Sequence, residues 1–285
     1  MTVRVPAKVN VHLRVQPPRP DGFHPIVTVF QAVALFDELT ATSAQGLSLA
    51  VEGADVPTDS ANLAWRAAEL LARTAGVAPD AHLHLRKAIP VAGGMAGGSA
   101  DAAAALLVCS RLWDVSTDLG ALAAVLGSDV AFPLLGGTAV GTGRGELLSP
   151  IECEQLHWAF AFADFGISAG DTYRELDRLR AAGAAAPTAD RTDALVTALA
   201  RGNVDDIGPL LHNDLQVAAL SLAPTLQATL DEGRAAGAVA GIVSGSGPTC
   251  AFLCRSSAHA RAVADRLSGR TATATGPVAG ATVLP

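Results

Sequence analysis

The chain has 285 residues, of which 50% are hydrophobic and only 4% aromatic, and its formal net charge is −7 at pH 7. This length supports an aliphatic core in one large domain or two modest ones. The mildly acidic balance argues against a general nucleic-acid binder or a protein that binds membrane surfaces.

Neither targeting nor metal binding by cysteine is indicated. The first residues, Met-Thr-Val-Arg-Val-Pro, are broken by charge and proline and lack the apolar core of a signal peptide. The apolar region 121–143 contains Asp129 and several glycines, so it is a poor membrane span. The 4 cysteines form no Cys-x-x-Cys or Cys/His cluster, which argues against zinc. We therefore expect a soluble cytoplasmic protein with reduced thiols.

The chain opens with strict alternation of apolar and polar residues over 2–16. This pattern predicts a half-buried strand, with Lys8, Asn10 and His12 together on its polar face. Two further strands and a helix are expected next, the helix capped at its start by Asp59 or Ser60 and stopped by Gly76. They cover residues 27–35, 47–51 and about 62–74, respectively.

A predicted strand over 82–86 leads into a glycine-rich loop, 90–100, which has 4 glycines within six residues. An alanine-rich helix follows, with Ser99 as the expected N-cap and an end near Trp113. Glycine allows close approach of an anion, and a helix N-terminus offers free N–H groups, so this combination predicts a phosphate site. A plain strand-to-helix turn is the alternative. The loop is no Walker A motif, because no Gly-Lys-Ser/Thr follows.

The second half alternates predicted strands and helices around glycine-rich turns at 136–145 and 244–248. The expected strands are 151–163, 239–243, 249–254 and 281–284. The expected helices are a short one from Ser128 to Pro133, then 172–181, 192–201, 224–236 and 257–267, with an exposed loop over 181–191. This order predicts an α+β protein of two lobes, 1–150 and 151–285, with a cleft between them.

Single residues are ambiguous at this stage. Lys8 has an ordinary alternative as a surface lysine, and Asp129 as a helix-capping carboxylate. The turn Ser244–Pro248 is either a hairpin connection or a backbone platform against the first glycine loop.

Three segments in this order change the interpretation, namely Pro6-Ala-Lys-Val-Asn10, 90–103 and 241–249. Together they resemble the three motifs of the GHMP kinases, ATP-dependent kinases of small molecules, and the resemblance spans nearly the whole chain. The stretches Arg19–His24, Thr28–Gln31 and Leu126–Pro133 are similar to members that act on a cytidine-diphosphate-linked methylerythritol.

The resemblance implies an N-terminal mixed α/β lobe, a ferredoxin-like C-terminal lobe and an active site in the cleft between them. It implies transfer of the ATP γ-phosphate, with Mg²⁺, to the 2-hydroxyl of the methylerythritol moiety, a step of the non-mevalonate route to isoprenoids. Lys8 and Asp129 match the catalytic pair, and Asn10, Phe23 and His24 match the substrate region. The residues expected to bind ATP are Asn62, Pro90, Val91, Ala92, Gly93, Gly94, Met95, Ala96, Gly97, Gly98, Ser99 and Ala100.

Two rivals stay open. One is another GHMP kinase acting on homoserine, mevalonate or a sugar, against which Asp21-Gly-Phe-His24 argues. The other is a non-catalytic metabolite-binding protein on the same scaffold, against which the presence of both Lys8 and Asp129 argues. No metal ligand is assigned, and the oligomeric state is open between a monomer and a weak homodimer.

Overall fold

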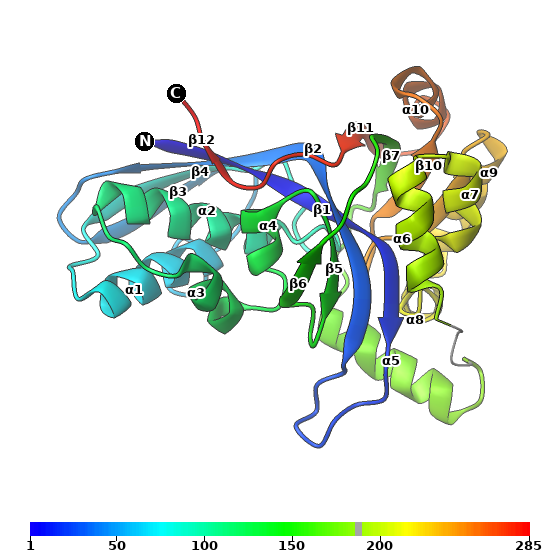
Figure 1. Ribbon diagram of the computed structural model, residues 1–285, viewed down its shortest axis with the longest axis horizontal. Helices are drawn as coiled ribbons and strands as arrows, with labels where there is room; N and C mark the ends of the chain where they lie inside the picture. Colours follow the sequence, from blue (N-terminus) through cyan, green and yellow to red (C-terminus); the bar gives the residue numbers. More distant parts are fainter. Residues whose placement is uncertain (186–189) are drawn as a thin grey trace.

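The computed structural model describes residues 1–185 and 190–285, so residues 186–189 of the predicted loop lie outside the described part. The strands form an eight-stranded and a four-stranded sheet. The larger sheet and its helices lie on the left of Figure 1 and the smaller sheet on the right. None of the described helices combines the length and the apolar composition needed to cross a membrane.

The larger sheet is built around two long antiparallel strands, β1 (Thr2–Val15) and β2 (Ile26–Thr42). Its main path has the order β12-β1-β2-β4-β3, and β5, β6 and β8 branch from it. The bounds are β3 Leu47–Glu52, β4 Ala81–Arg86, β5 Thr138–Thr142, β6 Leu147–Pro150, β8 His212–Asn213 and β12 Thr282–Val283. Because β8 and β12 both pair with β1, the second half of the chain contributes to this sheet, and the boundary near residue 150 stays a prediction.

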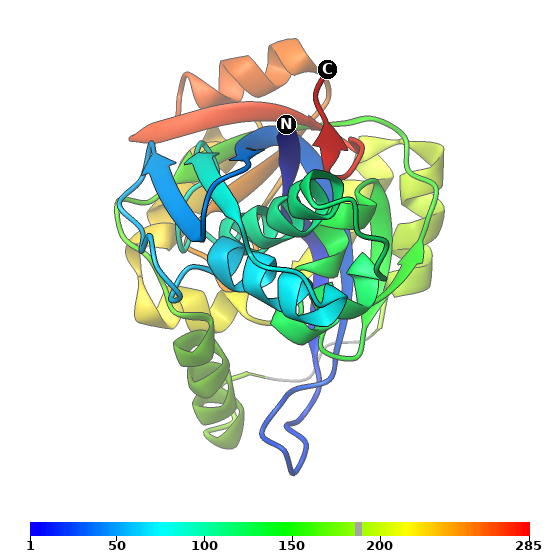
Figure 2. The ribbon, with the colours of Figure 1, turned by 90° about the vertical axis from the view of Figure 1, so that its left-hand side faces the viewer.

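Four helices accompany this sheet: α1 (Leu63–Ala75), α2 (Gly97–Leu112), α3 (Leu119–Leu126) and α4 (Ala131–Leu135). In Figure 2, α1, α2 and α3 lie together in front of the strands. Helix α2 is buried along most of its length, including the run Ala102–Leu106, because alanine side chains let a helix axis approach its neighbours closely. The glycine loop is therefore attached to a helix held firmly in the core.

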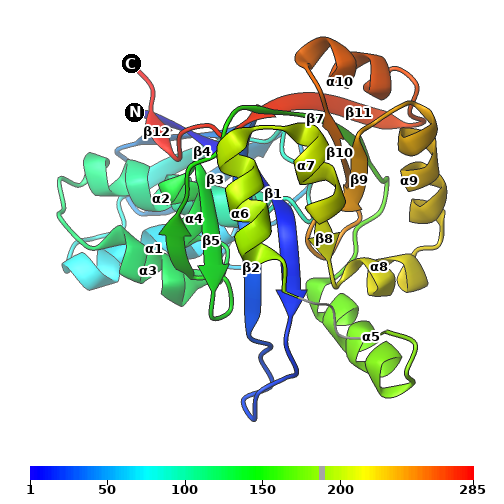
Figure 3. The ribbon, with the colours of Figure 1, turned by 45° about the vertical axis from the view of Figure 1, so that its right-hand side comes forward.

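The smaller sheet contains β7 (Leu156–Phe162), β9 (Ala240–Val243), β10 (Cys250–Cys254) and β11 (Arg270–Gly276). Its order is β11-β7-β10-β9 with every neighbour antiparallel. In chain order this is fourth, first, third, second, the ferredoxin-like arrangement that we expected. Figure 3 shows the helices of this half around it. They are α5 Ala169–Ala181, α6 Thr192–Arg201, α7 Val204–Ile207, the 3₁₀ turn Gly208–Leu210, α8 Gln216–Leu222, α9 Thr225–Ala235 and α10 Ser257–Ala264.

Several expected element starts are wrong by a few residues. Helix α2 begins at Gly97, because Ala96 takes a left-handed conformation (φ 59°) and ends the loop before Ser99 is reached. Helix α1 is capped by Asn62, whose side chain accepts from the Ala64 N–H, and not by Asp59 or Ser60. The short helix after Asp129 starts at Ala131, and residues 128–130 form a turn before it.

Some elements were missed altogether. The predicted turn region 136–145 contains β5, which pairs with β6 in a hairpin, and the expected strand 151–163 begins only at Leu156. Strand β11 has the sequence Arg-Thr-Ala-Thr-Ala-Thr-Gly, which alternates but contains no large apolar residue. Helices α3 and α8 are short, so their hydrophobic periodicity is weak.

The half-buried character expected of β1 is wrong over its centre. Lys8 is 4%, Asn10 2% and His12 0% exposed, although they lie on the polar face. This face is covered because β8 pairs with His12 and the two glycine-rich turns lie over Lys8 and Asn10. A polar face that is buried in this way needs internal partners, and these partners define the site.

Candidate active site

The two glycine-rich turns, far apart in sequence, touch one another. The Ser244 hydroxyl donates to the Gly94 carbonyl (3.1 Å), and the Thr249 N–H donates to the Gly93 carbonyl (3.3 Å). Gly94 has φ +75°, and a Cβ there would collide with the Ser244 carbonyl oxygen. The turn 244–248 also connects the antiparallel strands β9 and β10, so it is both a hairpin connection and a platform for the first loop.

Asn213 on β8 holds the second turn in place. Its Nδ2 donates to the carbonyls of Val243 and Gly245, both at 2.7 Å, and its Oδ1 accepts from the Leu215 N–H. This asparagine was not predicted to have a role, because a single polar residue in a short segment has no recognisable pattern. Its contribution is to fix a backbone that lies directly against the site.

Lys8 lies where the two turns meet. Its Nζ is 2.5 Å from Asn10 Oδ1, 3.0 Å from the Gly94 carbonyl oxygen and 3.5 Å from Asp129 Oδ2. Asn10 is itself oriented by donating from Nδ2 to the Thr28 hydroxyl (2.8 Å). The structure thus brings together the two residues expected to be the catalytic pair, from β1 and from the turn before α4.

The two members of this pair differ in exposure. Asp129 is 34% exposed, whereas Lys8 is 4% exposed. Burial lowers the pKa of Lys8 from its ordinary value, and the nearby Asp129 carboxylate opposes part of this shift. The Asp129 carboxylate therefore neutralises the Lys8 ammonium only in part, and a second anion bound nearby would be stabilised.

A cleft of about 840 Å³ contains this pair together with Asn10, Phe23 and His24. The expected phosphate-loop residues that also line it are Ala92, Gly93, Gly94, Ala96, Gly97, Gly98 and Ser99. Met95 and Ala100 are fully buried and support the loop from behind. Asn62 does not line the cleft: its Oδ1 caps α1 and its Nδ2 donates to the Pro57 carbonyl. Its role beside the adenine ring stays a prediction.

The far end of the cleft is lined by groups from three elements. Phe23 is 51% exposed, and the Arg144 guanidinium lies over its ring at 5.3 Å. His24 Nε2 is 3.0 Å from Asp177 on α5, and the His24 ring is 5.0 Å from the Tyr173 ring. Arg144, Tyr173 and Asp177 were not predicted, because nothing in their local sequence shows that they converge on one cavity.

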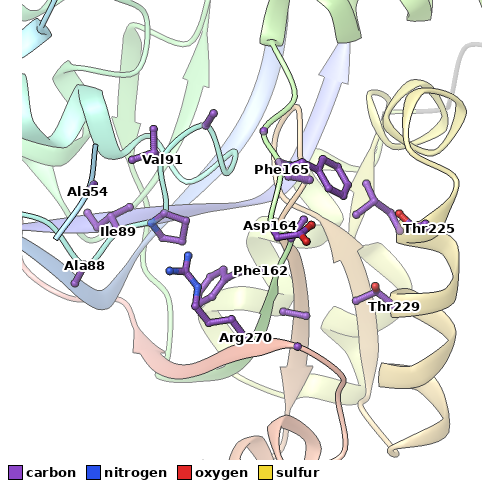
Figure 4. A pocket seen from close by; sticks show the side chains of 18 of the residues that line it. Ala54, Ala88, Ile89, Val91, Phe162, Asp164, Phe165, Thr225, Thr229 and Arg270 are labelled. Atoms are coloured by element: carbon purple, nitrogen blue, oxygen red, sulfur yellow. The ribbon is translucent and has the colours of Figure 1, made fainter. Parts of the chain in front are cut away.

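A second cavity, of about 850 Å³, lies on another side of the glycine loop. Figure 4 shows Ile89 and Val91 on one wall and Thr225 and Thr229 across from them, with Arg270 beside Phe162. Pro90, Val91 and Ala92 line this cavity, but Lys8 and Asp129 do not. The pair expected to be catalytic therefore lies in the first cleft and not in this cavity.

Behind the loop lies a buried cluster of Lys87, Asp37 and Asp101. Lys87 Nζ is 2.6 Å from a carboxylate oxygen of each aspartate. Asp37 Oδ1 also accepts from the N–H groups of Ala88 and Ile89, immediately before the glycine loop. The cluster therefore ties the start of the loop to β2 and to α2.

The donor set suits Mg²⁺ held mainly by phosphate oxygens. Among residues 1–185 and 190–285, no group of three or more His, Cys, Asp or Glu side chains could hold a metal ion. Mg²⁺ usually keeps several waters and takes one or two carboxylates plus substrate phosphates. Asp129 and Ser99 both line the cleft, beside Lys8 and at the start of α2 respectively, and each has a side-chain oxygen that could serve as a ligand.

Comparison with known proteins identifies the family. The GHMP kinases N terminal domain matches residues 62–137, and the GHMP kinases C terminal domain matches residues 195–272. A protein of Thermobifida fusca named 4-diphosphocytidyl-2-C-methyl-D-erythritol kinase is 56% identical, with 100% of this chain and 98% of the relative covered. A relative of the same name from Mycobacterium avium is 54% identical over 100% of this chain and 94% of its own length.

Solved structures agree. A crystal structure of 4-(cytidine 5'-diphospho)-2C-methyl-D-erythritol kinase aligns with a TM-score of 0.83 and 34% identity, over 96% of this chain and 98% of that one. The homoserine kinase of Cytophaga hutchinsonii aligns with a TM-score of 0.75, but at 17% identity, over 100% of this chain and 97% of that one, which shows a common fold alone. The chain belongs to the GHMP kinase family.

Proposed function

We propose that this protein phosphorylates the 2-hydroxyl of 4-diphosphocytidyl-2-C-methyl-D-erythritol with ATP, giving the 2-phosphate and ADP, in the non-mevalonate isoprenoid pathway. The observation that carries the proposal is the 3.5 Å approach of Lys8 to Asp129 in a cleft lined by the glycine loop. The names of the relatives at 53–56% identity over nearly the whole chain support the substrate.

The glycine loop and α2 hold the phosphates. The left-handed conformations of Gly94 and Ala96 turn the backbone sharply just before α2 begins at Gly97. The first N–H groups of this 16-residue helix have no partner within the helix, and its dipole is positive at this end. Phosphate oxygens of ATP bind there without needing a lysine from the loop.

Asp129 accepts the proton of the substrate hydroxyl as that oxygen attacks the γ-phosphorus. The bond between the γ-phosphorus and the β–γ bridging oxygen breaks in the same step, and ADP leaves. Lys8 orients Asp129 and stabilises the charge on the transferred phosphoryl group. Phosphoryl transfer depends mainly on such alignment and charge stabilisation, because little covalent help from the protein is required. Mg²⁺ would be held mainly by phosphate oxygens, with Ser99 and Asp129 as candidate protein ligands, and would neutralise phosphate charge.

The substrate lies between this pair and the far end of the cleft. Phe23 offers an exposed ring on which cytosine stacks, and His24 offers a hydrogen-bonding edge beside it. Asn10 also lines the cleft and lies beside Lys8, since its Oδ1 accepts from the Lys8 ammonium. We further propose that the lobes divide near residue 150 and that the enzyme works in the cytoplasm as a monomer or weak homodimer on its two small-molecule substrates.

The test is coupled release of ADP with a panel of alcohols. We expect turnover with 4-diphosphocytidyl-2-C-methyl-D-erythritol and none above background with homoserine, mevalonate or a sugar. The Asp129→Ala variant serves as the control for contaminating kinases. Turnover of another alcohol in preference would contradict the proposed substrate, and nucleotide binding with no ADP release would favour a non-catalytic protein.

A further inference from the structure

We propose that Asp177 is a positioning residue that selects cytosine over uracil, because it fixes which ring nitrogen of His24 carries the proton. The inference rests on the proposed function, in that it takes His24 as the group that meets the base. It adds a residue from α5, in the second half of the chain, to a recognition site in which Phe23 and His24 come from the first half.

The His24 ring is held by two residues of α5, Asp177 at its Nε2 edge and Tyr173 beside its ring. Its Nε2 is 3.0 and 3.1 Å from the two oxygens of Asp177, and its ring lies 5.0 Å from that of Tyr173 with 31° between the planes. Tyr173 and Asp177 are four residues apart on α5, so they lie on the same face of that helix. The His24 side chain is only 8% exposed, which limits its freedom further.

This contact determines the tautomer. An ionised carboxylate can only accept hydrogen bonds, so the proton of a neutral His24 ring is on Nε2. The other nitrogen, Nδ1, then carries a lone pair and accepts. Among the described residues no donor is bonded to Nδ1, although His24, Tyr173 and Asp177 all line the cleft. An acceptor is therefore left for a ligand.

The two pyrimidines differ at the position that such an acceptor would meet. Cytosine presents an amino group, a donor, where uracil presents a carbonyl oxygen, an acceptor. A lone pair on Nδ1 bonds the amino group, whereas against uracil it would leave two acceptors face to face. Sites built around a hydrogen bond reject the analogue that cannot make it, because the protein group then remains unpaired.

The experiment measures CDP and UDP as inhibitors competing with the cytidine substrate, in the wild type and in Asp177→Asn. An amide can present either its oxygen or its NH₂ to Nε2, so the tautomer of His24 is no longer determined. We expect the wild type to bind CDP at least about tenfold tighter than UDP, which is the size of effect expected from one hydrogen bond. The variant should lose most of this preference. The variant should raise KM and leave kcat unchanged.

Glu175→Gln is the matched control, because it makes the same chemical change on the same helix. Glu175 bonds Arg178 and Ser221 and does not line the cleft, so the CDP preference should stay as in the wild type. If Asp177→Asn weakens CDP and UDP equally, or leaves their ratio unchanged, the inference is wrong. A wild type that fails to turn over the cytidine substrate would instead overturn the proposed function, and the CDP-to-UDP ratio, then measured as direct binding by calorimetry, would still test Asp177.

Discussion

Lys8 and Lys87 are both buried beside the glycine loop, yet their surroundings differ in charge. Lys87 has two carboxylates at 2.6 Å, from side chains that are 0% and 5% exposed. Lys8 has one partly exposed carboxylate at 3.5 Å and two uncharged oxygens. The paired carboxylates raise the pKa of Lys87 in spite of its burial, whereas burial lowers the pKa of Lys8.

This difference separates an ion cluster that supports the loop from the ion pair that we propose to be catalytic. Burial raises the pKa of Asp101, and the single ammonium of the Lys87 cluster is bonded to two carboxyl groups at once. The charge of Lys87 is thereby fully paired within the protein. The ammonium of Lys8 keeps an unsatisfied attraction for anions, and it faces the cleft. Burial of a lysine therefore indicates function only when its charge is left incompletely paired.

The largest effect is expected from Lys87→Met. This change leaves the Asp37 carboxylate buried without its cation, and removing one partner of a buried ion pair costs about 3–5 kcal/mol of stability. Urea unfolding followed by circular dichroism measures it. Lys8→Met is the matched control and should lose much less, since Asp129 is partly hydrated. Equal losses in the two variants would contradict the distinction between the clusters.

For catalysis we expect the opposite ranking, in which changes at Lys8 and Asp129 have the larger effect. Asp129→Ala and Lys8→Ala should each lower kcat by about 10²-fold or more, because each removes a group that acts on the reacting hydroxyl or phosphoryl oxygen. ATP binding to Asp129→Ala, measured by calorimetry, should stay near that of the wild type, since the loop backbone and Lys8 are intact. Substantial turnover in Asp129→Ala would refute its assignment as the base.

His12 is a third buried basic side chain, in addition to Lys8 and Lys87, and its ring has no hydrogen-bond partner among the described residues. Both of its ring nitrogens lack a partner among the described residues, and burial is the main cause that lowers its pKa to about 4. The unfolded chain takes up this proton near pH 6.5 and the folded protein only near pH 4. Stability should therefore fall as pH drops through this window, by up to about 3 kcal/mol.

The check on His12 is urea unfolding at several pH values, with His12→Phe as the comparison. The variant keeps an aromatic ring of similar size but has no titrating nitrogen. Its stability should depend less on pH than that of the wild type between pH 6.5 and 4. Identical slopes in both proteins would show that His12 does not remain neutral in the folded state.

The smallest effect is expected from Phe23→Ala, at the exposed end of the cleft. Loss of a stacked base costs about 1–3 kcal/mol, so KM for the cytidine substrate should rise while stability stays the same. Phe36→Ala is a suitable comparison, since Phe36 also lies under a guanidinium, that of Arg4 at 4.6 Å, but outside the cleft. A rise in KM of less than about twofold would exclude stacking on Phe23.

Local patterns were sufficient for many elements. The helix Thr192–Arg201 has the predicted bounds, and Gly76 ends α1 in a left-handed conformation as expected. The free cysteines of β10 also agree with the prediction of reduced thiols. Strand β11 was missed, because its stability comes from pairing with β7 and not from its own apolar content.

The amino-acid order predicted the glycine-rich loop before a helix, the approach of Lys8 to Asp129, and the family, since each depends on residue types at fixed spacing. The binding of phosphate by the loop stays a prediction. Residues that act only by meeting others across the fold carried no such pattern. Asn213 supports the second turn through pairing of β8 with β1, and Asp177 reaches His24 through the placement of α5. A buried polar group obtains its charge state and its tautomer from neighbours distant in sequence, and packing alone brings those neighbours together.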